Sequence, residues 1–154
     1  MTGPASGAPR LVVTFEPDAL KRLGDLVRRE ATGTELMGLL VGSVEPHTGT
    51  GNILVHIVDY LPARYTRAGP TFVSTTDRTW QDLLERKQSA FPDSTVVGWY
   101  HTHPDAPFLS AEDERLHRSF FPNAWHVALV SNAEFTRRIL FGWVDGSLKR
   151  IDFR

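Results

Sequence analysis

The sequence contains no cysteine, so neither disulfides nor thiolate ligands are possible, and any bound metal must rely on His, Asp or Glu. No apolar run is long enough to span a bilayer. Residues 1–9 lack the basic and apolar regions of a signal peptide. An excess of one charge is also missing, because 17 basic and 18 acidic residues give a net charge of −1. We therefore expect a cytoplasmic protein that binds neither nucleic acid nor membrane.

The composition is that of an ordinary globular protein. Of the 154 residues, 41% are hydrophobic and 23% are charged, which is enough for one domain with its own core. The small Pro- and Gly-rich residues at 1–9 predict a flexible N-terminal tail. The sequence therefore predicts a single domain over residues 10–154.

Apolar periodicity along the chain predicts a mixture of strands and helices. The predicted strands cover 11–15, 35–44, 52–60, 95–103 and 125–130, followed by a hairpin of 137–144 and 147–153 around Asp145-Gly146. The predicted helices cover 17–31, 111–121 and a segment capped by Thr75 or Thr76. Along one face that segment carries the apolar stripe of Trp80, Leu83, Leu84 and Phe91, with Lys87 at the same helical spacing. We expect a loop at 61–70 and a short edge strand at 71–74. The mixture predicts an α+β fold with helices covering a mostly antiparallel sheet.

Two histidines follow directly after the apolar strand that begins at Thr95. Because side chains alternate along a strand, His101 and His103 are predicted to lie on one face. A Pro-rich turn then leads to Ser110-Ala-Glu-Asp113, which opens a predicted helix and can return Asp113 to the same point. Two His and one carboxylate form a catalytic zinc set, with three protein ligands and a fourth position left for water.

Other interpretations exist for each part of this motif. The two histidines can be ordinary hydrogen-bonded residues, as we expect for His56 on its sheet face, and Ser110 with Asp113 can be a simple helix cap. Metallo-β-lactamase-type hydrolases carry His-x-His-x-Asp-His, but Ala106 occupies the last position here. Cupins place His-x-His in an all-β barrel, which the predicted helices disfavour. His117, four residues after Asp113, offers a fourth ligand that would make the site structural.

The motif as a whole resembles the JAMM/MPN (Mov34/JAB) family of zinc metallopeptidases. The family pattern of an upstream Glu, His-x-His-Pro and Ser-x-x-Asp is matched by Glu35, His101-Thr-His103-Pro104 and Ser110-Ala-Glu-Asp113. The upstream segment Glu35-Leu-Met-Gly38-Leu-Leu-Val-Gly42 also looks like the family's first motif strand. Nine residues separate His103 from Asp113, one fewer than is usual, so we expect a tightened loop at 105–109. The short chain is most similar to the stand-alone bacterial members.

This resemblance implies a fold and a reaction. The fold would be a mostly antiparallel curved sheet flanked by helices, with the layering of cytidine deaminases. One Zn²⁺ per chain would be held by His101, His103 and Asp113. Glu35 would act as the general base and Ser110 would hydrogen bond to the reacting oxygen, so that an amide is hydrolysed without a covalent intermediate.

The resemblance also implies a class of substrate. Family members cleave the isopeptide bond at the C-terminus of ubiquitin or a ubiquitin-like modifier, and bacterial relatives work alongside activating and conjugating enzymes. The segment 61–74 is expected to add the substrate's extended tail as a strand. Two other functions stay open: a non-catalytic MPN-type protein-binding scaffold, and an amidase acting on small peptides.

Overall fold

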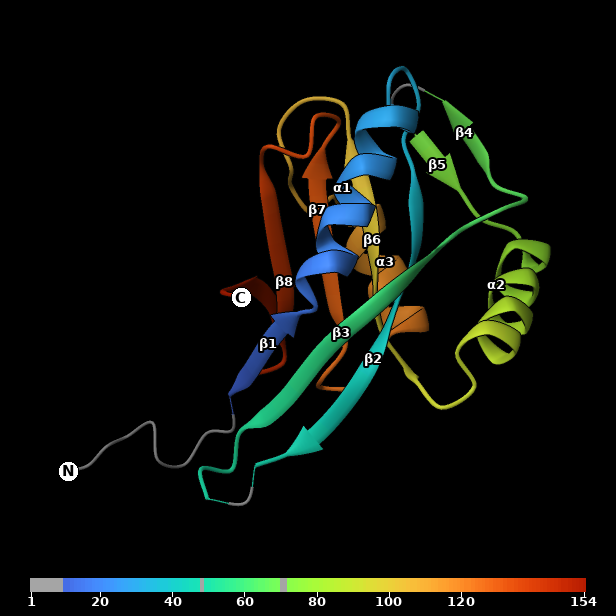
Figure 1. Ribbon diagram of the computed structural model, residues 1–154. Helices are drawn as coiled ribbons and strands as arrows, with labels where there is room; N and C mark the ends of the chain where they lie inside the picture. The colour runs from blue at the N-terminus through green and yellow to red at the C-terminus, as the bar shows by residue number, and fades with distance from the viewer. Residues whose placement is uncertain (1–9, 48, 70–71) are drawn as a thin grey trace.

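The computed structural model describes residues 10–47, 49–69 and 72–154, so the predicted tail at 1–9 lies outside the described residues (Figure 1). The strands are β1 (Leu11–Phe15), β2 (Met37–Pro46), β3 (Ile53–Pro62), β4 (Arg67–Gly69), β5 (Phe72–Ser74), β6 (Thr95–His103), β7 (Val127–Asn132), β8 (Arg138–Val144) and β9 (Ser147–Ile151). The helices are α1 (Pro17–Glu30), α2 (Asp77–Ala90) and α3 (Ala111–Phe120). Within the described residues, no helix is long and apolar enough to cross a membrane.

Seven strands form one mixed sheet in the order β1-β3-β2-β6-β7-β8-β9. The β1–β3 and β6–β7 pairs are parallel, while β2–β3, β2–β6, β7–β8 and β8–β9 are antiparallel. The predicted α+β class with a mostly antiparallel sheet is therefore confirmed. Strand β6, which carries the two histidines, lies near the middle of the sheet between β2 and β7.

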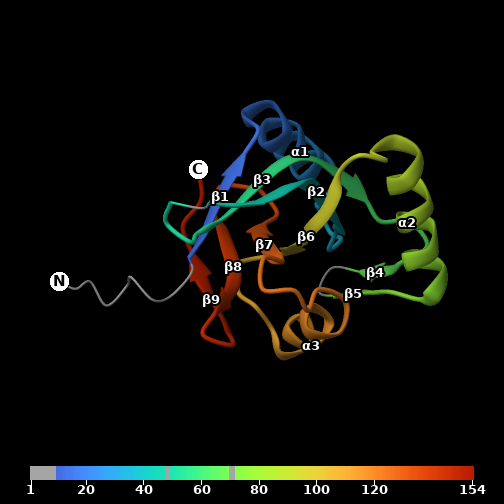
Figure 2. The same cartoon turned by 90° about the horizontal axis from the view of Figure 1, so that it is seen from below.

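The sheet is curled so strongly that its first strand meets the C-terminus (Figure 2). Val13 forms a parallel bridge with Phe153, and the backbone N–H of Arg154 donates to the Val13 carbonyl at 3.0 Å. The rings of Phe15 and Phe153 pack edge to face with centroids 5.2 Å apart. These contacts cover the outer edge of β1, which would otherwise expose unpaired backbone groups.

Two hydrophobic cores lie on opposite faces of the curled sheet. The larger core packs α1 on one face, through Leu23, Leu26 and Val27. The smaller core packs Leu83 of α2 and Phe121 after α3 against the other face. Because α3 lies on the second face, the helix that follows the motif covers the side of the sheet that bears the histidines.

Local sequence signals explain where the helices begin. Pro17 occupies the first turn of α1, where its missing N–H leaves no bond unmade. Thr76 caps α2 and Ser110 caps α3, each in a reciprocal capping box with the residue three positions later. The three predicted helices are confirmed, with ends that differ by a residue or two from the expectation.

The segment between β3 and α2 differs from its prediction. Residues 61–70 were expected to form a loop, but β3 continues to Pro62 and residues 67–69 form β4. The short edge strand predicted at 71–74 is confirmed as β5 (Phe72–Ser74), which pairs with β4 in a separate two-stranded sheet. Short polar segments carry little periodicity, so their pairing depends on neighbours distant in sequence.

Two smaller predictions also need correction. The strand expected at 35–44 begins at Met37, because the Glu35 N–H donates to the Gly69 carbonyl at 2.8 Å instead of joining the main ladder. Leu84, expected in the apolar stripe of α2, is 55% exposed, whereas Leu83 is fully buried. Helix α2 lies at the rim of the sheet, where only a narrow stripe of its surface finds a partner.

The close approach of β6 and β7 generates a test of the sheet register. Gly98 pairs with Val127, and a Cβ at Gly98 would collide with the Val127 carbonyl oxygen. We expect Gly98→Ala to reduce the free energy of unfolding by about 1–3 kcal/mol, because the backbone must shift to make room. Urea unfolding measures the change. Gly49→Ala is the control, since its Cβ would meet only the flexible His47 side chain. Equal effects of the two substitutions would contradict the register.

Candidate metal centre

The two histidines of β6 point to the same face of the sheet. His101 and His103 are 6% and 8% exposed, so both rings are buried. Thr102 between them points to the other face, where its hydroxyl accepts the Leu36 N–H at 2.8 Å and its own N–H donates to the Leu36 carbonyl at 3.0 Å. Thr102 therefore fixes the backbone next to Glu35 against the histidine strand.

Helix α3 brings Asp113 to the two rings. In its capping box, the Asp113 N–H donates to Ser110 Oγ at 3.1 Å and the Ser110 N–H donates to Asp113 Oδ2 at 3.0 Å. Asp113 Oδ1 lies 2.9 Å from His101 Nδ1, and Oδ2 lies 3.0 Å from His103 Nε2. The nine-residue connection from His103 is therefore long enough to bring this carboxylate to the histidines.

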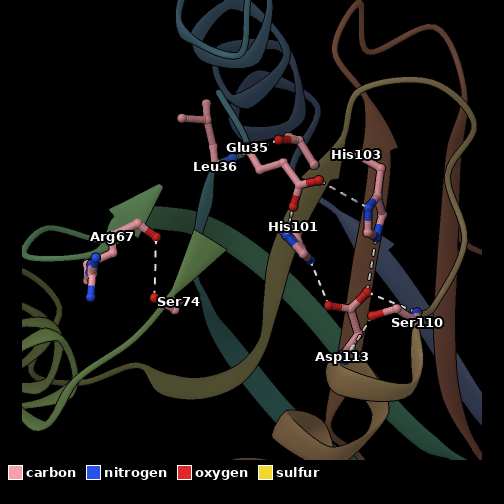
Figure 3. Close-up of polar contacts among 9 residues, drawn as sticks. Glu35, Leu36, Arg67, Ser74, His101, His103, Ser110 and Asp113 are labelled. Carbon is pink, nitrogen blue, oxygen red and sulfur yellow. Dashed lines mark hydrogen bonds and ion pairs between the residues drawn. The ribbon is translucent and has the colours of Figure 1, made fainter. Parts of the chain in front are cut away.

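Glu35 approaches the same two rings from the opposite side (Figure 3). Its Oε1 lies 3.0 Å from His101 Nε2, and its Oε2 lies 3.5 Å from His103 Nδ1. The side chain is 4% exposed. Each of the two carboxylates thus bridges both imidazoles, and we call Glu35, His101, His103 and Asp113 the buried cluster.

The buried cluster has a strong electrostatic demand for positive charge. Burial by itself lowers the pKa of His101, but the hydrogen bonds with Asp113 and Glu35 outweigh burial and raise it to about 9. Burial raises the pKa of Asp113, but the hydrogen bonds with His101 and His103 lower it well below its usual range. A carboxylate that is ionised away from water needs a compensating cation, which protonated imidazole or a metal ion can supply.

The donor set of the cluster fits zinc. One nitrogen of each ring and one Asp113 oxygen all lie within 4.8 Å of one another, so a single ion can contact all three. Imidazole nitrogen and carboxylate oxygen are both zinc ligands, and three of them make a catalytic type of site. A divalent cation at this point would also supply the charge that the two carboxylates require.

The cluster opens into a cleft of about 610 Å³. Ser74 and Thr75 line one part of it, and Ser110 and Glu112 of the α3 N-terminus line another. Phe108, 55% exposed, stacks on His103 with ring centroids 4.5 Å apart. The candidate site is therefore reachable by a substrate, with the buried cluster at its floor.

The other two histidines considered from sequence lie away from the cluster. His117 Nδ1 accepts a hydrogen bond from Trp99 Nε1 at 2.9 Å, and His117 does not belong to the group that can share an ion. His56 lies on the sheet face expected for it, with Nδ1 2.7 Å from the Thr14 hydroxyl. The sequence did not predict that Thr102 binds the backbone of Leu36 or that Trp99 donates to His117. A threonine or a tryptophan in a strand carries no local signal of such a contact.

Comparison with known proteins places this arrangement in a family. The sequence profile of the JAB1/Mov34/MPN/PAD-1 ubiquitin protease family matches residues 10–122, which include the whole buried cluster and Ser110. The chain belongs to this family, and the resemblance noted in the sequence is confirmed.

A curated relative supports the same assignment. The 26S proteasome regulatory subunit RPN11 of Eremothecium gossypii is 30% identical over 94 residues, which are 60% of this chain and 28% of that protein. The chain thus corresponds to little more than a quarter of that relative's length.

His117 generates a prediction about acid stability. Burial lowers its pKa from 6.5 to about 4, with a further lowering from the positive charges of His126 and Arg118. Between pH 6.5 and 4 the unfolded chain therefore binds more protons at His117 than the folded chain does. The stability that neutral His117 contributes is complete above pH 6.5 and is lost as the pH falls towards 4. We expect a loss of roughly 3 kcal/mol in the unfolding free energy of the metal-free protein across this window.

The matched measurement compares wild type with His117→Asn by urea unfolding from pH 7 to pH 4. The difference between the two proteins isolates His117, because His126, whose pKa burial also lowers, is present in both. Parallel stability curves for the two proteins would show that His117 does not contribute.

Proposed function

We propose that residues 10–154 form a zinc-dependent isopeptidase domain that hydrolyses the amide bond at the C-terminus of ubiquitin or a ubiquitin-like modifier. The observation that carries the proposal is the position of Glu35. A second acidic side chain besides Asp113 would not be needed to bind the ion, yet Glu35 lies within 3.5 Å of both candidate histidine ligands. A buried carboxylate at this distance is placed to exchange protons beside the ion.

His101, His103 and Asp113 would hold the ion. When bound, Zn²⁺ supplies Lewis-acid chemistry, because it polarises an amide carbonyl and makes water acidic enough to lose a proton near neutral pH. Asp113 keeps its orientation through the capping box with Ser110, and the two histidines keep theirs because they lie on a central strand.

Glu35 accepts a proton from the attacking water and passes it to the nitrogen of the leaving amine. Its backbone is held on two sides, by the Gly69 carbonyl and, through Leu36, by Thr102. This restraint keeps the carboxylate near the reacting atoms without making it a ligand.

Ser110 is suited to donate a hydrogen bond to the substrate oxygen. Its Oγ accepts the Asp113 N–H, so its own hydroxyl proton stays free to point into the cleft that Ser110 lines. A donor aimed at the developing oxyanion is worth about 3 kcal/mol in the transition state.

The β4–β5 sheet offers a binding edge for an extended substrate tail. In the described part of the chain β5 pairs only with β4, and Ser74 at the end of β5 lines the cleft. Figures 1 and 2 show this small sheet beside α2, apart from the seven-stranded sheet. A modifier tail paired with β5 would lead its last peptide bond towards the cluster.

The lining of the cleft favours an internal amide over the end of a small peptide. No lysine or arginine is among the described residues that line the cleft. An enzyme that recognises a free C-terminal carboxylate uses a cation or backbone donors for it. An isopeptide bond, whose acyl group has no free carboxylate, does not require such a contact. Activating and conjugating enzymes of the same modifier are the partners that this function implies.

The metal site leads to a direct test. We expect about one zinc ion per chain after dialysis, and we expect His103→Ala to lose it, because a site with three protein ligands has none to spare. Elemental analysis by mass spectrometry measures the content. His56→Ala is the control, since His56 lies outside the buried cluster. Stoichiometric zinc in a His101/His103 double mutant would contradict the site, and wild-type protein without zinc would favour the non-catalytic scaffold.

The role of Glu35 leads to a separate test. Because a glutamine has nearly the same shape but cannot accept the proton, we expect Glu35→Gln to keep zinc and to lower the cleavage rate by about 10² to 10⁴. The assay is cleavage of a ubiquitin-like fusion and of an isopeptide-linked conjugate at matched zinc content. Glu114→Gln is the control, because Glu114 lies outside the buried cluster, is partly exposed and pairs with Arg118. Near-equal rates would remove Glu35 from the reaction, and loss of zinc would make it a ligand.

A further inference from the structure

Trp99 and His117 form a buried hydrogen bond directly behind the buried cluster. The Trp99 Nε1–H donates to His117 Nδ1 at 2.9 Å. Trp99 is 1% exposed and His117 is fully buried. Neither side chain can bind the ion, so the proposed reaction leaves this contact without a role.

The contact joins the two elements that carry the candidate ligands. Trp99 precedes His101 by two residues on the same face of β6, and their rings stack with centroids 5.7 Å apart and planes at 25°. His117 lies one helical turn after Asp113 on α3, hence on the same side of the helix. The contacts form a closed loop from Asp113 to His101, Trp99, His117 and, along the helix, back to Asp113.

A histidine at position 117 lowers the stability of the fold relative to an apolar residue. Because Nδ1 accepts the hydrogen bond from the indole N–H, the neutral ring carries its own proton on Nε2. Although the backbone of His126 lies near the ring, Nε2 makes no hydrogen bond of good geometry within the described residues. A buried donor without a partner lowers stability, and an apolar side chain would avoid that cost. The acceptor that histidine offers to Trp99 distinguishes it from an apolar residue here.

We infer that the Trp99–His117 hydrogen bond is a positioning contact that holds α3 against β6 and sets the separation of Asp113 from the two imidazoles before the ion binds. This inference rests on the proposed metal site. Without the bond, α3 and the Trp99 ring can shift independently, and part of the binding free energy is then used to restore the ligand geometry. Residues that orient metal ligands typically change metal affinity by about 10–100-fold when they are lost.

Two variants of His117 separate the hydrogen bond from packing. Asparagine and leucine have the same branched shape, but only the asparagine oxygen can accept a hydrogen bond from the Trp99 N–H near the position of Nδ1. We expect His117→Asn to bind zinc almost as tightly as wild type and His117→Leu to bind it about tenfold more weakly or worse. Zinc dissociation constants are measured by competition with a chromophoric chelator, which needs no substrate.

Two controls make the result specific. In a Trp99→Phe background the donor is gone, so we expect the two His117 variants to bind zinc equally. Thermal unfolding of the metal-free proteins in the same Trp99→Phe background reports packing alone, and there we expect similar Tm values for His117→Asn and His117→Leu.

Three results would overturn the inference while leaving the metal site in place. Equal zinc affinities of the two variants would show that the hydrogen bond does not position the ligands, and a difference that persists with Trp99→Phe would assign it to another contact. A Tm difference between the two variants in the Trp99→Phe background would assign the affinity loss to packing instead of the hydrogen bond. Wild-type protein that binds no zinc would instead contradict the metal site itself, and with it this inference.

Discussion

The side chains of Glu35 and Asp113 are both removed from water, and each bridges the rings of His101 and His103. Ionised carboxylates are expensive to bury unless a positive charge and hydrogen bonds compensate for the lost water. Much of the surrounding structure serves this requirement. The histidines come from a central strand, and Asp113 is held in a capping box that satisfies two further backbone groups, so the four side chains meet with little freedom to separate.

The order of strands in the curled sheet makes this meeting possible. Strand β6 lies between β2 and β7, so the backbone just before β2 runs beside the histidine strand. This brings Glu35 to the side of the two imidazoles opposite Asp113. Thr102 and the Gly69 carbonyl then hold that backbone on two sides. The small β4–β5 sheet is thus connected to the cluster by the hydrogen bond between Glu35 and Gly69 of β4. A peptide paired with that sheet would lie close to Glu35.

The family match and the geometry cover the same part of the molecule. Residues 10–122 include β1 to α3 and thus every member of the buried cluster, whereas β7 to β9 lie beyond the match. These later strands complete the sheet, and residues 153 and 154 close it against β1. The candidate site therefore lies in the part shared with relatives, while the last strands support the strand that carries the histidines. The Trp99–His117 contact lies within the shared part, behind the ligands.

Local patterns in the sequence were sufficient to predict much of this site. Alternation along residues 95–103 predicts that His101 and His103 share a face, and the Ser110–Asp113 spacing predicts a cap whose carboxylate turns back towards them, because both rules act over a few neighbouring residues. The partner of β5, the exposure of Leu84 and the bond between Trp99 and His117 could not be predicted this way. Glu35 meets His101 across 66 residues, and only family resemblance suggested that contact. Such pairings depend on which strands become neighbours when the sheet curls, a property of the packed chain that local periodicity does not encode.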